Sequence, residues 1–143
     1  MTSTIEDDIQ TVLKNCRTIA LVGASPKPER PSHEVMEYLL SQGYEVVPVN
    51  PSQAGSHILG QFVYAALADI PFPVDLVDVF RDSEATPEIV EQALAIHAKA
   101  VWLQLGISNP LARGKAYAGK IMYIEDRCVK IEHAKLKAQL HAQ

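Results

Sequence analysis

Several short segments place glycine, hydroxyl and basic residues directly after apolar runs, and these residues are the most able to do chemistry. The first segment begins with Gly23, Ala24 and Ser25 and continues through Lys27 and Arg30. A glycine after a strand lets backbone approach a phosphate, and the next helix offers free N–H groups at its start. We predict a phosphate site here rather than a proline-stiffened turn with two solvated cations. A branched residue at position 23 should then abolish binding while the fold survives.

Two further segments follow the second and third apolar runs. Asn50 stands where NAD-binding sheets carry an acidic residue for the ribose hydroxyls, and no acid follows until Asp69. Asn50 can cap its own turn, contact a ligand, or do both. Phe80 and Arg81 could flank an adenine and a phosphate. The alternative places Phe80 in the core and pairs Arg81 with a neighbouring carboxylate.

The last two segments contain Gln104 and Gly106, and then Cys128 and His133. Gln104 can donate and accept hydrogen bonds in a buried pocket, and Gly106 permits close backbone approach, although a structural turn explains both equally well. A Cys–His nucleophilic pair is disfavoured, because an offset of five on one helix places the two side chains on different faces. We interpret Cys128 as a small core residue and assign no catalytic residue and no metal site.

The elements that must position these segments alternate between strand-like and helix-like patterns. We expect strands at 17–22, 44–49, 74–80, 99–103 and 120–124, separated by amphipathic helices. This alternation requires right-handed crossovers and a parallel sheet covered on both faces. The predicted fold is a Rossmann-like α/β domain, a doubly wound parallel sheet of five strands that spans residues 1–143 as a single domain. Ligands of such sheets bind at the carboxyl ends of the strands.

Local signals refine these expectations. Ser3 and Glu6 have the spacing of a capping box at the first helix, and Thr86 before Pro87 reads as the N-cap of a later one. We expect a loop over 51–61 and one helical turn over 63–67.

Composition excludes several classes of protein. The formal net charge of −4 argues against a broad nucleic-acid surface. No apolar run approaches the roughly 18 to 20 residues of a membrane helix, and the acidic start is unlike a secretory signal. Cys16 and Cys128 form neither a disulfide framework nor a zinc motif. We therefore expect a cytoplasmic protein.

Taken together, the segments resemble the stand-alone CoA-binding domain family of bacteria and archaea, which is similar to the CoA-binding domain of the succinyl-CoA synthetase α subunit. The stretches that carry the resemblance follow the family's order along nearly the whole chain: 18–26, 30–32, 47–51, 74–81, 102–106 and 126–133.

The resemblance implies coenzyme A as the ligand, with its diphosphate near Gly23, Ala24 and Ser25. Its adenosine would lie toward Asn50, Val79 and Arg81, with Phe80, Gln104 and Gly106 completing the site. Lys27 and Arg30 could neutralise the 3′-phosphate. Two departures from the synthetase matter: residues 51–61 contain no lysine, and we expect no counterpart of the domain that carries its phosphorylated histidine. The inherited function is binding rather than ligation.

The leading hypothesis is a non-catalytic module that binds CoA or an acyl-CoA as a carrier or sensor and that could act with a protein partner or as a homo-oligomer. One alternative is an enzyme that acts on CoA thioesters or CoA disulfides with Cys128 as its reactive thiol. A second alternative is an NAD-type dinucleotide-binding protein. The missing Gly-x-Gly-x-x-Gly pattern and the missing acid after the second strand count against this last alternative.

Overall fold

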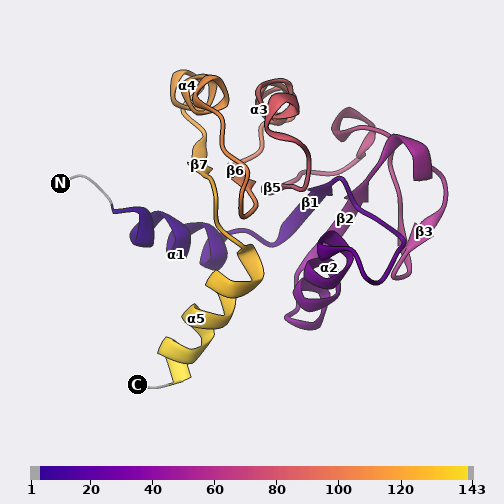
Figure 1. The fold of residues 1–143 in the computed structure, drawn as a ribbon, viewed down its shortest axis with the longest axis horizontal. Coiled ribbons are helices and arrows are strands. Elements are labelled where there is room, and N and C mark those ends of the chain that lie inside the picture. Colours follow the sequence, from indigo (N-terminus) through magenta and orange to yellow (C-terminus); the bar gives the residue numbers. More distant parts are fainter. Residues whose placement is uncertain (1–3, 142–143) are drawn as a thin grey trace.

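The computed structural model describes residues 4–141 and contains a five-stranded parallel sheet of order β2-β1-β5-β6-β7 (Figure 1). This confirms the predicted Rossmann-like α/β fold. Each strand begins one or two residues later than the sequence indicates, because the first residues of each apolar run still belong to the preceding turn. The strands are β1 (Thr18–Val22), β2 (Glu45–Val49), β5 (Leu76–Val79), β6 (Ala100–Leu103) and β7 (Met122–Ile124).

Helices cover both faces of this sheet (Figure 1). Side chains alternate along a strand, so β1 directs Ile19 and Leu21 to one apolar layer and Ala20 and Val22 to the other. No helix within residues 4–141 is long and apolar enough to cross a membrane. The first layer packs against α1 (Ile5–Asn15), α2 (Pro31–Ser41) and α5 (Val129–His141), and the second against α3 (Thr86–Ala95) and α4 (Pro110–Ala118).

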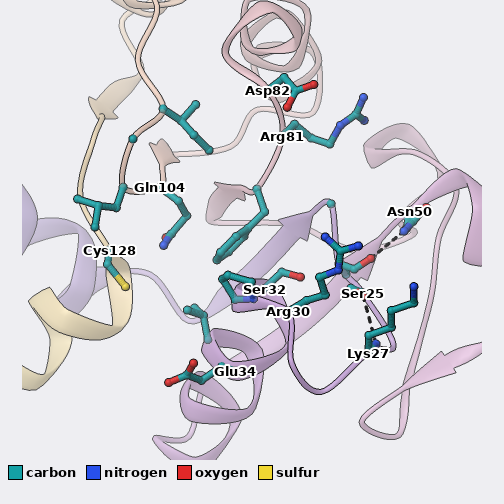
Figure 2. Close-up of a pocket in the computed structure, with 18 of the residues that line it drawn as sticks. Ser25, Lys27, Arg30, Ser32, Glu34, Asn50, Arg81, Asp82, Gln104 and Cys128 are labelled. Atoms are coloured by element: carbon teal, nitrogen blue, oxygen red, sulfur yellow. Dashed lines mark hydrogen bonds between the residues drawn. The ribbon is translucent and has the colours of Figure 1, made fainter.

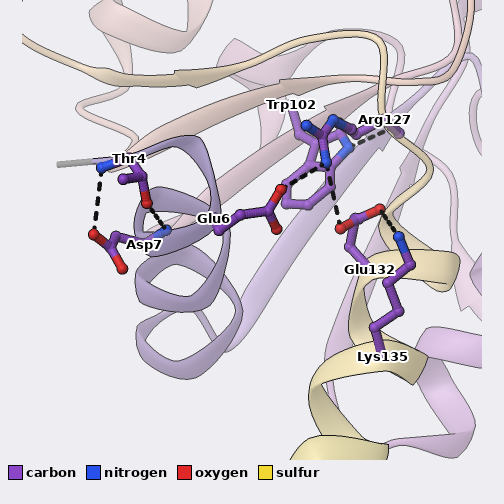
Figure 3. Close-up of polar contacts among 7 residues, drawn as sticks. All are labelled: Thr4, Glu6, Asp7, Trp102, Arg127, Glu132 and Lys135. Atoms are coloured by element: carbon purple, nitrogen blue, oxygen red, sulfur yellow. Dashed lines mark hydrogen bonds and ion pairs between the residues drawn. The ribbon is translucent and has the colours of Figure 1, made fainter.

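Two predicted helix starts are displaced. The capping box of α1 joins Thr4 and Asp7, whose side chains each bond the other's backbone N–H (Figure 3). The predicted partner Ser3 lies outside the described residues. Thr86 is the first residue of α3 and not its N-cap, because its hydroxyl donates backwards to the Ser83 carbonyl at 2.6 Å.

The segment between β2 and β5 is more ordered than the predicted loop and helical turn. It contains the antiparallel pair β3 (His57–Ile58) and β4 (Gln61–Phe62), and short 3-10 turns η1 (Pro51–Gln53) and η2 (Leu67–Asp69). The helical turn therefore begins at Leu67, where the prediction ended. Edge-to-face ring contacts stabilise this segment through His57, Phe62, Tyr64 and Phe72.

The start of α5 is tied to the sheet and to α1. The indole Nε1–H of Trp102 donates to the Arg127 carbonyl oxygen at 2.8 Å. The Arg127 guanidinium contacts Glu6 and the buried carboxylate of Glu132, which also pairs with Lys135 (Figure 3). These contacts bring residues near position 128 back to the carboxyl ends of the strands.

The order of the strands reverses between β1 and β5. From β1 the chain crosses to β2 on one side, whereas β6 and β7 extend from β5 on the other side. The loops that leave β1 and β5 therefore diverge onto opposite faces, and a crevice opens between them. In doubly wound sheets, this is the place where ligands bind.

Asp78 occupies an unusual position in the centre of β5. Its neighbours across the sheet are Leu21 and Trp102, and its side chain is fully buried. Among the described residues, neither carboxylate oxygen has a hydrogen-bond partner. Burial disfavours the charged form and raises the pKa of Asp78 well above its ordinary value.

We expect Asp78→Asn to change the pH dependence of stability. Because the folded pKa is raised, the folded chain keeps a proton that the unfolded chain loses above pH 3.8. The wild type should therefore lose up to about 1.4 kcal/mol of unfolding free energy per pH unit relative to the variant as pH rises toward the folded pKa. The free energy of unfolding of both proteins is measured in urea at pH 5 and pH 8. An equal change in the two proteins between these pH values would contradict the prediction.

Asp75→Asn provides a control of opposite sign. Burial opposes ionisation of Asp75, but the N–H groups of Arg17 and Thr18 and the Lys99 ammonium outweigh it and lower the pKa. Its stabilising effect is present above the unfolded pKa and is lost as pH falls through the folded value. The difference in the free energy of unfolding between wild type and Asp75→Asn should therefore decrease as the pH is lowered.

Candidate functional site

A cleft of about 1200 Å³ lies at the reversal of strand order (Figure 2). It is bounded by the loops that follow β1, β2, β5 and β6, by the start of α2 and by the start of α5. A smaller hollow of about 650 Å³ adjoins it, and both are lined by Gly23, Asn50 and Arg81. The site residues expected from the sequence line this cleft, with one exception described below.

The loop after β1 forms one wall of the cleft. The N–H groups of Gly23 and Ala24 both point at the Val49 carbonyl, at 3.0 and 3.4 Å, so they are not free for a phosphate. Ser25 Oγ accepts from the Lys27 N–H at 3.2 Å. This loop therefore uses its first amides to hold the ends of β1 and β2 together.

The start of α2 offers the donors that the first amides of the loop do not. Its N-cap Arg30 makes no side-chain capping bond, and Pro31 occupies the first turn. Within the described chain, the Ser32 N–H has no backbone acceptor, and its side chain lies in the cleft wall. A helix N-terminus with free N–H groups attracts anions. Ser32 was not among the residues expected from the sequence, although its place in the first turn of a predicted helix was the signal.

Gly23 is required by close packing rather than by a ligand. Its φ is +92°, and an added Cβ would collide with the Phe80 carbonyl oxygen and lie 3.0 Å from the carbonyl carbon. The expectation that a branched residue would leave the fold intact is therefore wrong, because the side chain would meet backbone before it met any phosphate.

Asn50 acts as a tie between loops. Its Nδ2 donates to the Ala24 carbonyl at 2.7 Å, and its Oδ1 accepts from the N–H and hydroxyl of Ser52. The predicted side-chain cap of the turn is thus present. Every polar atom of this side chain has a protein partner, so Asn50 shapes the wall of the cleft through its neighbours.

Three cations lie at the end of the cleft that is formed by the loops after β1 and β5. Lys27, Arg30 and Arg81 are exposed, line the cleft, and make no ion pair with any described residue. The proposed pairing of Arg81 with a neighbouring carboxylate is therefore not seen. Asp82 and Glu84 also line the cleft, so its charge is mixed on the β5 side.

The adjacent residues Val79 and Phe80 direct their side chains to opposite faces of the sheet. Phe80 lines the cleft and packs against the α1, α2 and α5 layer. Val79 points to the other face and is fully buried in the α3 and α4 layer. Strand alternation therefore removes the Val79 side chain from the set of expected ligand contacts.

The far end of the cleft is built by the loop after β6 and the start of α5. Gln104 is only 5% exposed, and its Oε1 accepts from the Val129 N–H at 3.3 Å. Gly106 has a φ of +84°, and its N–H donates to Asp126 Oδ1 at 2.7 Å. Both residues line the cleft, as expected from their sequence positions.

Cys128 is half-buried: it packs against the α1, α2 and α5 layer, as its interpretation as a core residue requires, and it also lines this far end of the cleft (Figure 2). His133 lies one turn into α5, with Nδ1 at 2.8 Å from the Tyr38 hydroxyl. Burial, together with Lys137, lowers the pKa of His133. Within residues 4–141, no hydrogen bond joins Cys128 to a base and no cluster of metal ligands is formed.

The parallel sheet with helices on both faces and a reversal of strand order defines a Rossmann-like α/β domain. The CoA binding domain family matches residues 17–134, and the chain belongs to that family. It is 36% identical over 130 residues to the uncharacterized protein YneT of Bacillus subtilis, covering 91% of this chain and 95% of that protein.

Two further relatives extend the comparison. A hypothetical protein from Pyrococcus horikoshii is 40% identical, with a TM-score of 0.86, and the match covers 95% of this chain and 99% of that one. The α subunit of an ADP-forming acetate–CoA ligase from Pyrococcus furiosus is 31% identical over 84 residues, which cover 56% of this chain and 18% of that protein.

We expect Gly23→Ala to destabilise the fold more than Gly106→Ala does. Both positions have positive φ, so each alanine costs roughly 1–2 kcal/mol of backbone strain. Only position 23 adds a collision with backbone, since nothing lies within 4 Å of a Cβ at position 106. An extra loss of about 1–3 kcal/mol at position 23 is expected in urea unfolding. Equal losses of unfolding free energy in the two variants would show that the Phe80 backbone, directly after β5, can move away from position 23 without cost.

Proposed function

We propose that this protein binds coenzyme A or an acyl-CoA across the strand ends, as a non-catalytic carrier or sensor module. The observation that carries the proposal is the group of three cations, Lys27, Arg30 and Arg81, beside the N-terminus of α2. Phosphates of the ligand would supply the missing counter-charges. Membership of the CoA-binding domain family supports this choice over other phosphate-bearing ligands.

The proposed orientation follows the chemistry of the cleft. The diphosphate lies at Ser25, Ser32 and the start of α2, where free N–H groups and positive charge coincide. The adenosine lies toward Asn50 and Arg81, where the smaller hollow opens. The pantetheine arm then runs past Phe80 toward Cys128, whose end of the cleft carries fewer charges.

The absence of an acid after β2 also separates CoA from NAD. Asn50 occupies that place, and its side chain is fully engaged with Ala24 and Ser52. No carboxylate at this position can accept the ribose hydroxyls of NAD. The 3′-phosphate of CoA, in contrast, adds charge for nearby cations to neutralise.

Calorimetric titration should show tighter binding of CoA than of NAD, ATP or dephospho-CoA. Lys27→Ala and Arg30→Ala should each weaken CoA binding by about three- to tenfold, because they remove solvent-exposed charge-assisted contacts. Both variants should also reduce the difference in affinity between CoA and dephospho-CoA.

Lys14→Ala is the matched control for these variants, since Lys14 is exposed on α1 and does not line the cleft. It should leave CoA affinity unchanged. Equal wild-type affinity for CoA and dephospho-CoA would remove the role given to Lys27 and Arg30.

A second candidate function is favoured by the position of Cys128 within the cleft. The thiol at the start of α5, after losing its proton to solvent, could attack one sulfur of oxidised CoA as the thiolate. The disulfide bond would break, one CoA would leave as its thiolate, and a mixed disulfide would remain on Cys128. Against this, no described base forms a hydrogen bond with Cys128, and a nucleophilic thiol needs such a base or a strong positive field.

Cys128→Ser should leave CoA affinity within about 1 kcal/mol, because the swap is nearly isosteric at a half-buried position. The measurement is calorimetric affinity of the variant beside wild type. Intact mass of the wild type with oxidised CoA at neutral pH tests the rival function. A stoichiometric adduct that Cys128→Ser abolishes would move the protein to thiol chemistry.

A further inference from the structure

The two ends of the cleft differ in chemistry. Lys27 and Asn50 lie at one end, whereas Gln104 and Cys128 lie across the cleft from them (Figure 2). At the Gln104 end, the Lys130 cation of the rim is already paired with Glu34 at 2.8 Å. A ligand that enters with its phosphates at the first end therefore places an uncharged group at the second.

Gln104 is a donor without a partner. Because its Oε1 must accept from the Val129 N–H, its amide is fixed with Nε2 on the other side. Within the described chain, no group accepts a hydrogen bond from Nε2, although the side chain is 5% exposed and lines the cleft. Nε2 is not one of the fully buried unpaired atoms of the described residues, so it is reachable from the cleft and can donate to a carbonyl oxygen of a ligand.

Apolar side chains open to solvent stand beside this donor. Leu105 is 65% exposed and Ile131 is 48% exposed, and both line the cleft together with Phe80 and Ile107. Free CoA ends in a small thiol that covers little of this surface. An acyl chain attached to that thiol would cover it, in continuity with the rest of the ligand.

We propose that the ligand is an acyl-CoA thioester, whose carbonyl accepts from Gln104 Nε2 and whose acyl chain lies on Leu105 and Ile131. The inference rests on the proposed function and specifies its ligand. It assigns the Gln104 end of the cleft to the thioester, and the cations of the opposite end to the phosphates.

Three ligands distinguish the contact of the carbonyl with Gln104 from the contact of the acyl chain with Leu105 and Ile131. They are CoA, octanoyl-CoA and S-octyl-CoA, a thioether that has the chain but lacks the carbonyl. In calorimetry, octanoyl-CoA should bind at least about tenfold more tightly than CoA, since each fully buried methylene is worth about fourfold. S-octyl-CoA should bind with intermediate affinity. Gln104→Met should remove the difference between octanoyl-CoA and S-octyl-CoA.

Leu105→Ser and Leu111→Ser form a matched pair of variants. Both leucines are highly exposed, at 65% and 61%, but only Leu105 lines the cleft. Leu105→Ser should weaken octanoyl-CoA binding at least about threefold more than it weakens CoA binding. Leu111→Ser should alter neither. Because Leu105 is on the surface, this variant tests the proposal even if Gln104→Met fails to fold.

Each contrary outcome has a distinct meaning. If CoA binds and octanoyl-CoA binds no more tightly, the acyl proposal is overturned and the proposed function stands. If neither binds, the proposed function itself fails. If Leu105→Ser dissociates a dimer while both ligands bind equally, the apolar rim belongs to a second copy of the chain, and the acyl proposal is again overturned.

Discussion

The approach of β1 to β5 at their carboxyl ends is the constraint on which the rest of the site depends. Phe80 N–H donates to the Val22 carbonyl at 2.8 Å, and Gly23 N–H donates to the Val49 carbonyl at 3.0 Å. The ends of β1, β2 and β5 are thus joined by backbone alone, with no room for a Cβ at position 23. Because the loops leave this junction in opposite directions, the cleft has a rigid floor and walls of longer side chains.

The fold was predictable from the sequence because buried parallel strands are continuous apolar runs. The β3–β4 pair was not, since two-residue strands show no periodicity over His57–Ile58 and Gln61–Phe62. The capping box was misplaced by one residue because adjacent hydroxyls satisfy nearly the same spacing, and the structure uses Thr4. Such choices depend on the tertiary position of the helix, which local patterns do not contain.

The parts of the candidate site that are loops directly after strands were predictable from the sequence. The parts that depend on the alternation of side chains along a strand, or on contacts between distant positions, were less predictable. The prediction that Val79 contacts the ligand is wrong, because the alternation of side chains along β5 directs Val79 to the other face of the sheet. Cys128 enters the cleft because Trp102 and Glu132 hold Arg127 in place. The Trp102 contact joins positions 25 residues apart, and no spacing in the sequence signals it.

Trp102 has a consequence for observing the protein. It is the single tryptophan of the chain, it is fully buried, and its indole bonds directly to the backbone that precedes Cys128. A ligand that displaces the Arg127 carbonyl changes the surroundings of that indole. The protein therefore contains its own fluorophore, buried one hydrogen bond away from the residue that precedes Cys128. A ligand that shifts the start of α5 would therefore change the emission of this indole.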